Sequence, residues 1–170
     1  LIYPHHESEI ILAEKIGLGN YCDFWMHNGL MEDSEGKLSK SRGERITLEE
    51  VFTDCPPPAL RFYLLGFHYR DFTPYSPEGL LEACQEGERL GVNAVDCMVV
   101  EPTDPREDEE TAPLVTKFED ALSDDLDTPR TLDVLRELDV IAGNRLKNKG
   151  DIGPISGMYS IFQCVLGVFS

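Results

Sequence analysis

The longest helical pattern in the sequence, Pro129 to about Lys147, constrains the fold of this chain more than any other feature. Its apolar residues follow the 3-4-4 spacing of a buried stripe, at Leu135, Leu138, Ala142 and Leu146. Such a stripe must be covered by other elements. Three more helical patterns are available to cover it: Ser76 to about Val92, Pro113 to about Ser123, and Ile155 to Phe169. With no alternating strand pattern after residue 75, the second half is predicted to be a small antiparallel helical bundle.

The first 75 residues show shorter elements of both kinds. Leu1-Ile2-Tyr3 is predicted to end a buried strand, Glu7–Gly17 to form a helix, and Cys22–His27 to form a short strand. An exposed turn is expected at Asp33–Gly36. This order of strand, helix and strand indicates that the first 75 residues form half of a doubly wound α/β sheet.

Two helices are predicted beyond that turn. Thr47 is a credible N-cap, and Glu50 three residues later completes the pattern of a capping box. The prolines at 56–58 interrupt the chain before a helix expected at Ala59–Phe67. The predicted fold class is therefore α/β followed by all-α, with an α/β domain at 1–75 and a helical domain at 76–170.

Composition narrows the classes of function. The net charge of −17 argues against a general nucleic-acid binder, and adaptation to a salty cytoplasm or an ordinary acidic protein would both explain it. The acidic run Glu101–Glu110 is predicted to be a solvated linker. Five scattered cysteines without a Cys-x-x-Cys pair disfavour a disulfide framework. Without a membrane-length apolar run or a signal-peptide pattern, we expect a cytoplasmic protein with no membrane partner.

The stretch Lys37-Leu38-Ser39-Lys40-Ser41 has the composition of a phosphate-binding loop. Two ammonium groups three residues apart can follow phosphate oxygens as charge moves, and the small neighbouring residues let the backbone come close. A solvated basic turn is the alternative interpretation of these five residues alone. Upstream lie two further motifs, Pro4-His5-His6-Glu7-Ser8-Glu9 and Trp25-Met26-His27-Asn28-Gly29.

His5 and Glu9 are four residues apart at the start of a predicted helix, so their side chains leave the same face. An imidazole and a carboxylate at this spacing can share one zinc ion. Zinc usually takes three or four protein ligands, and a salt-bridge or capping role is the alternative from the residues alone.

This succession of motifs resembles the second half of the catalytic domain of the cysteinyl-tRNA synthetases, class I enzymes whose signature loop reads Lys-Met-Ser-Lys-Ser. The resemblance extends through Leu60–Leu65, His68-Tyr69-Arg70 and Asp124–Arg130. It implies that the parent enzyme activates cysteine with ATP and Mg²⁺ and transfers it to tRNA(Cys). The second half would be the helical domain that contacts tRNA; His68 and Arg70 would contact tRNA or close a helix end.

The resemblance also assigns roles to particular residues. Lys37 and Lys40 would be catalytic and would bind the ATP phosphates together with Ser39 and Ser41. His27 and Gly29 would lie near the adenosine. His5 and Glu9 would bind Zn²⁺ together with two cysteines that precede the motif in the family, so the zinc site is incomplete in this chain.

The chain does not contain the family's His-x-Gly-His motif. We therefore expect the chain alone to be inactive, with the N-terminal half of the enzyme as its missing partner. Two alternatives remain at this point: a cysteine ligase of mycothiol synthesis, which shares the motifs but uses an amino sugar as acceptor, and a non-catalytic acidic helical binding module.

Overall fold

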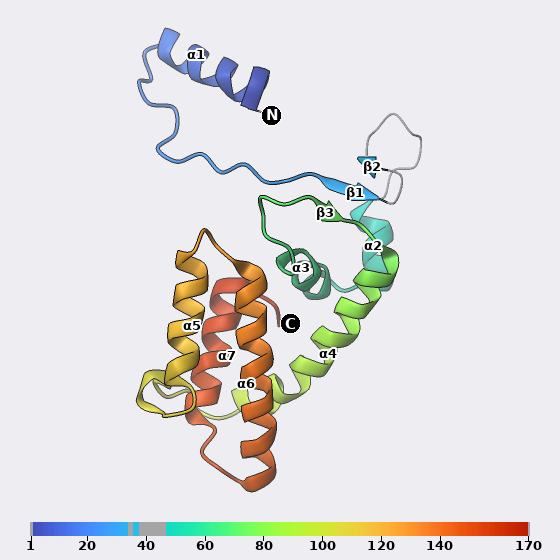
Figure 1. Ribbon diagram of the computed structural model, residues 1–170, viewed down its shortest axis with the longest axis vertical. Helices are drawn as coiled ribbons and strands as arrows, with labels where there is room; N and C mark the ends of the chain where they lie inside the picture. Colours follow the sequence, from blue (N-terminus) through green and yellow to red (C-terminus); the bar gives the residue numbers. More distant parts are fainter. Residues whose placement is uncertain (1, 34–35, 38–46, 170) are drawn as a thin grey trace.

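The fold is mostly helical, with one small sheet (Figure 1). The computed structural model describes residues 2–33, 36–37 and 47–169. Its helical elements, in chain order, are η1 (Ile2–His6), α1 (Glu7–Lys15), α2 (Leu48–Asp54), α3 (Pro57–Leu65), α4 (Pro77–Met98), η3 (Pro105–Glu107), α5 (Ala112–Ser123), α6 (Thr128–Asn148) and α7 (Gly153–Leu166).

Three short strands form the sheet: β1 (Met31–Asp33), β2 (Gly36–Lys37) and β3 (Thr73–Pro74). In the order β2-β1-β3, β1 pairs antiparallel with β2 and parallel with β3. The antiparallel pair sets Asp33 opposite Gly36, and the turn expected at Asp33–Gly36 stays a prediction because Ser34 and Glu35 lie outside the described residues. The parallel pair is joined by a connection that includes α2 and α3, as in an α/β unit.

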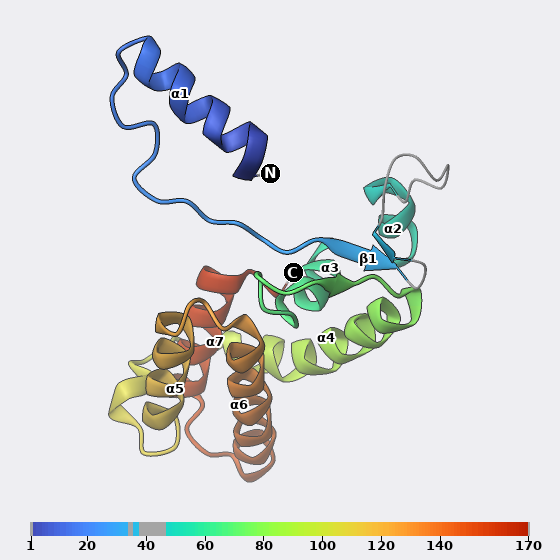
Figure 2. The ribbon, with the colours of Figure 1, turned by 45° about the horizontal axis from the view of Figure 1, so that its top comes forward.

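The strand expected at Cys22–His27 is wrong, because the first strand begins only at Met31. Phe24 and Met26, which would have formed one face of that strand, are 89% and 61% exposed. This segment instead belongs to a long connection between α1 and β1, and α1 lies apart from the helical bundle in both views (Figures 1 and 2).

The capping box expected at Thr47 is confirmed. The Glu50 N–H donates to Thr47 Oγ1 over 3.2 Å, and the Thr47 N–H donates to Glu50 Oε2 over 2.8 Å. These bonds satisfy N–H groups that a helix start leaves without partners. They fix the first residue of α2 immediately after residues 38–46.

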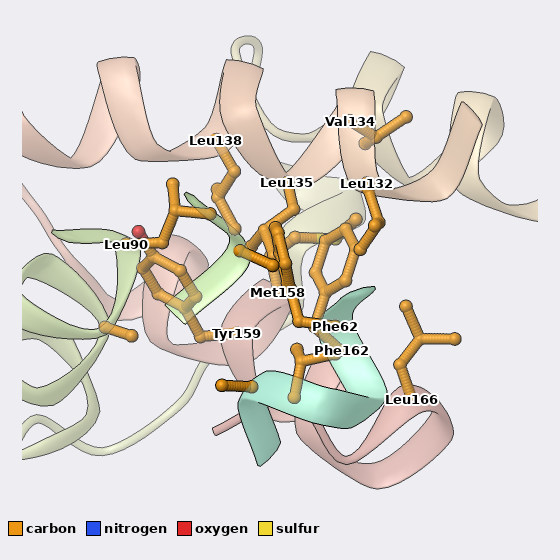
Figure 3. Close-up of a cluster of buried hydrophobic side chains, with 14 of the residues drawn as sticks. Phe62, Leu90, Leu132, Val134, Leu135, Leu138, Met158, Tyr159, Phe162 and Leu166 are labelled. Atoms are coloured by element: carbon orange, nitrogen blue, oxygen red, sulfur yellow. The ribbon is translucent and has the colours of Figure 1, made fainter. Parts of the chain in front are cut away.

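The core lies where α3, α4, α6 and α7 pack together (Figure 3). On α6 the predicted stripe is confirmed, since Leu135, Leu138 and Ala142 are fully buried. Phe162 of α7 meets Phe118 of α5 edge-to-face, with ring centroids 4.8 Å apart. The helices expected in the second half are all present, although α4 continues to Met98 rather than ending near Val92.

The acidic run is exposed over most of its length, as expected of a solvated linker, but it is also held against the bundle at Pro105 and Asp108. Pro105 is buried, and its carbonyl accepts a hydrogen bond from the buried Thr111 hydroxyl at 2.7 Å. Arg145 of α6 donates to both carboxylate oxygens of Asp108, at 2.8 and 2.9 Å. Arg145 also pairs with Glu110, so two of the acidic residues of the run contact this arginine.

Buried residues from Val51 to Val168 form a single cluster, which includes side chains on both sides of residue 75. The division into domains at that residue stays a prediction. Across the residues that the structure describes, no helix is long and apolar enough to cross a membrane.

Replacing Leu138 by alanine should lower the free energy of unfolding by about 2–5 kcal/mol, because it leaves a cavity under a fully buried side chain. Val140 lies two residues away on the same helix and is 65% exposed, so Val140→Ala should cost less than about 1 kcal/mol. Urea denaturation of both variants checks this. Equal losses would contradict the orientation of α6.

Candidate functional site

The two proposed zinc ligands lie at the N-terminal end of the structure. His5 lies in η1, two residues before α1 begins, Glu9 lies in the first turn of α1, and both side chains are exposed. Among residues 2–33, 36–37 and 47–169, no three His, Cys, Asp or Glu side chains are grouped so that they could hold a metal ion. The described residues therefore do not fit a complete zinc site, because they supply at most two of its ligands.

The neighbouring histidine, His6, makes a contact that the sequence did not reveal. His6 Nδ1 and His27 Nε2 share a hydrogen bond of 2.8 Å, and the two rings stack with centroids 4.9 Å apart. Trp25 stacks beside both rings, and Tyr21 stacks on Trp25. This aromatic cluster joins the start of α1 to the segment that leads to β1. It brings one motif histidine to the other, 21 residues away.

Gly29 follows this cluster and lies against the backbone of the segment before β3. Its N–H donates to the Tyr69 carbonyl over 2.7 Å, and a Cβ at this position would lie 1.7 Å from the Asp71 carbonyl oxygen. Glycine is therefore required for this close approach, whatever its role toward a nucleotide. The adenosine contact assigned to Gly29 and His27 stays a prediction.

The lysine loop is described only at its first lysine. The backbone of Lys37 lies in β2, paired with Glu32 of β1. Ser39, Lys40 and Ser41 lie outside the described residues, so the expected phosphate contacts stay predictions. The two ends of this segment are nevertheless defined, by the β1–β2 pairing on one side and the Thr47 capping box on the other. In both views the strand that holds Lys37 lies well away from α1 (Figures 1 and 2).

A polar contact joins the segment after α3 to the turn between α5 and α6. Arg70 donates to both oxygens of the Asp125 carboxylate, at 2.5 and 3.0 Å, and the Tyr69 hydroxyl donates to the same carboxylate at 2.8 Å. His68 Nε2 lies 3.1 Å from the Asp125 carbonyl oxygen. His68 and Arg70 therefore bond to the residue that directly follows the C-cap of α5, 55 to 57 residues away, and the alternative that they contact tRNA stays a prediction.

This contact holds the backbone and the charge of Asp125 in place. Asp125 and Leu126 have φ values of 54° and 58°, in the left-handed region that Asp tolerates better than Leu. The hydrogen bond from Arg70 lowers the pKa of the Asp125 carboxyl to about 2, and the bond from Tyr69 acts in the same direction. The Arg70–Asp125 contact thus joins the segment between α3 and β3 to the turn between α5 and α6 of the helical bundle.

Comparison with known proteins agrees with this arrangement of motifs. A family profile described as "tRNA synthetases class I (C) catalytic domain" matches residues 1–85. The chain belongs to this family. It is 30% identical to the cysteine–tRNA ligase of Pelobacter propionicus, in an alignment that covers all of this chain and 39% of that protein.

Two further relatives have the same name. The cysteine–tRNA ligase of Aquifex aeolicus is 39% identical over 88% of this chain and 32% of its own length. That of Paenarthrobacter aurescens is 34% identical over all of this chain and 35% of its own length. The chain therefore spans about a third of the length of the curated relatives that it matches.

The Arg70–Asp125 contact should make stability depend on pH in the acid range. A folded pKa of about 2 lies below the ordinary value of about 3.9, so the contribution of Asp125 is complete above about pH 4 and is lost as pH falls toward 2. In Asp125→Asn, which keeps a residue suited to positive φ, the deficit against the native chain should therefore shrink between pH 4 and pH 2.

Urea midpoints measured across this pH range test the dependence. Asp120→Asn is the matched control, because it removes the same charge from the exposed face of α5 without touching this contact. A deficit for Asp125→Asn that stays constant down to pH 2.5, or an equal pH dependence in the control, would contradict the assignment.

Proposed function

We propose that this chain is part of a cysteine–tRNA ligase, which activates cysteine with ATP and Mg²⁺ and transfers it to tRNA(Cys). The observation that carries the proposal is the alignment with proteins of that name over the whole chain, including the helical second half beyond residue 85. Family membership alone concerns the catalytic domain. Similarity across the helices extends the comparison to the part proposed to contact tRNA.

The proposed chemistry is electrostatic positioning of the triphosphate. Lys37 and Lys40 would bind the phosphates, Ser39 and Ser41 would add hydroxyl donors, and Mg²⁺ would share in neutralising the charge. The β1–β2 pairing and the α2 capping box support this assignment, because they hold both ends of the lysine segment. His27 and Gly29 would lie near the adenosine.

In this proposal, the described residues supply two ligands for zinc. His5 and Glu9 would supply an imidazole nitrogen and a carboxylate oxygen, and the remaining ligands would have to come from residues that the structure does not describe. A bound zinc would select cysteine through its thiolate. No other part of the proposal depends on this ion.

The architecture is proposed to follow from the same relationship. The parallel pair of β1 and β3, connected through α2 and α3, supports placing residues 1–75 in the second half of a doubly wound, Rossmann-like catalytic domain. Residues 76–170 would form the helical domain that contacts tRNA.

Cysteine-dependent exchange between ATP and pyrophosphate tests the activation step. In a chimera, residues 1–170 replace the aligned segment of the Pelobacter propionicus cysteine–tRNA ligase, because that alignment covers the whole of this chain, and exchange should be measurable. Lys40→Ala should then lower kcat/KM by about 10²-fold or more, because a phosphate-binding charge is lost. Lys147→Ala, at the far end of α6, is the matched control and should leave the rate unchanged. A folded chimera without exchange, or full activity in Lys40→Ala, would refute the proposal.

Acceptor choice tests the transfer step. The chimera should esterify tRNA(Cys) with cysteine and should not form an amide with an amino sugar, because its helical half is proposed to contact tRNA. The measurement is incorporation of labelled cysteine into each acceptor by the same enzyme preparation. Transfer to the amino sugar alone would support a ligase of mycothiol synthesis instead.

A further inference from the structure

Two thiols meet in the core where α2 ends against α4. The Cys84 thiol donates to Cys55 Sγ over 3.0 Å, and the two residues are 7% and 2% exposed. Cys55 is the C-cap residue that follows α2, and Cys84 is the eighth residue of the long helix α4. A disulfide places its sulfurs about 2.05 Å apart, so the thiols need to approach by only about 1 Å to form one.

We propose that Cys55 and Cys84 form a redox-sensitive pair, which closes to a disulfide when the protein meets a disulfide-forming oxidant. The proposal goes beyond the function above, because it involves neither the lysine segment nor the proposed zinc ligands. It names a modification site that joins two elements 29 residues apart in the sequence.

The reaction is a two-electron oxidation. Two S–H bonds break and one S–S bond forms, while both protons and both electrons pass to the oxidant. With diamide, a diazenedicarboxamide, the N=N bond takes up both hydrogens and becomes a hydrazine; with hydrogen peroxide, the O–O bond is broken and two molecules of water form. No group from the protein other than the two thiols is consumed.

Both cysteines line a surface pocket through which a small oxidant can approach. This pocket has a volume of about 720 Å³, and its lining includes Cys55, Cys84, Tyr75 and Leu81. Cys84 also lines a second pocket of about 470 Å³, together with Gly87 and Gly91 of α4. Cys97 is also buried on α4, but it lines neither of these two pockets.

The surroundings of Cys55 and Cys84 determine how fast the disulfide forms. Burial, followed by the hydrogen bond from Cys84, raises the pKa of the Cys55 thiol to about 12. The thiolate is the nucleophile in disulfide formation, so the pair should react slowly at pH 7 and faster as pH rises. It should therefore remain reduced in a reducing compartment and close only under sustained oxidation.

Closing the pair would tether α2. Val51 and Cys55 are buried at this helix, whereas Leu48 and Phe52 are 62% and 42% exposed, so α2 is held mainly at its C-terminal end. A covalent bond from Cys55 to α4 would restrict local opening of α2. The restricted helix, α2, begins at Leu48, shortly after residues 38–46.

Mass spectrometry of the 170-residue chain tests the pair. Cys22→Ser and Cys164→Ser first remove the two exposed thiols, which prevents links between molecules. After diamide treatment, the folded protein should lose about 2 Da, one pair of hydrogens, and proteolytic peptides should contain Cys55 linked to Cys84. Adding Cys84→Ser should abolish the link. Adding Cys97→Ser is the matched control and should preserve it.

Hydrogen exchange provides a second readout that needs no further variant. In the oxidised protein, the amides of α2 should exchange several-fold more slowly than in the reduced protein, while those of α6 remain unchanged. A folded chain that retains both thiols after prolonged oxidation would overturn the proposal. A link to Cys97, or a link that forms only in urea, would overturn it as well.

Discussion

The structure depends on one continuous buried stripe along α4. Towards its start, Leu80, Ala83 and Cys84 are buried on the side where α3 packs; further along, Leu90, Ala94 and Cys97 are buried where α6 and α7 pack. Figure 1 shows the helix running from the region of α2 and α3 down into the bundle. Because a single helix contributes to both groups of contacts, the sheet-bearing half and the helical half share one core. A helix that ended at Val92 would bury fewer residues between α6 and α7, and the extra turns to Met98 are what the bundle requires.

Arginine pairs set how α4 and α6 align. Arg136 donates to both oxygens of Glu86, at 2.7 and 3.0 Å, and this bond lowers the pKa of the Glu86 carboxyl. One turn further along, Arg89 and Asn93 donate to the buried carboxylate of Asp139 at 2.7 and 2.9 Å. A shift of one helix along the other would leave Asp139 buried without these donors, which costs far more than an exposed pair contributes. In a chain with a net charge of −17, these arginines place positive charge beside the carboxylates at the contact between α4 and α6.

Sequence patterns over a few neighbouring residues predicted the helices of this fold better than they predicted the contacts between distant residues. The capping box of α2 and the buried stripe of α6 depend on residues three or four apart, and both were predicted from the sequence. Partners far apart in the sequence were not, because no periodicity links Arg70 to Asp125 or His6 to His27. The expected strand at Cys22–His27 was wrong for the same reason: its aromatic residues suit a strand, but a strand forms only where another one pairs with it. At the candidate site, the residue types were assigned from motifs, and the sequence did not reveal that Gly29 packs against the Asp71 backbone.

Stability and the proposed chemistry occupy different parts of the chain. Of the described residues before Val51, Ala13 is the one apolar side chain that is buried, whereas the core extends from Val51 to Val168. Helix α1 is held by its aromatic contacts rather than by a core, so it gains little of the free energy that burial supplies to the bundle. Ligand-binding segments are commonly drawn from the less stable parts of a protein, because they must move when a substrate binds. The division found here follows that pattern: the bundle and α4 supply a rigid base, and the segment with the upstream motif residues is attached to the rest of the fold by backbone contacts, the Gly29–Tyr69 hydrogen bond and the β1–β3 pairing.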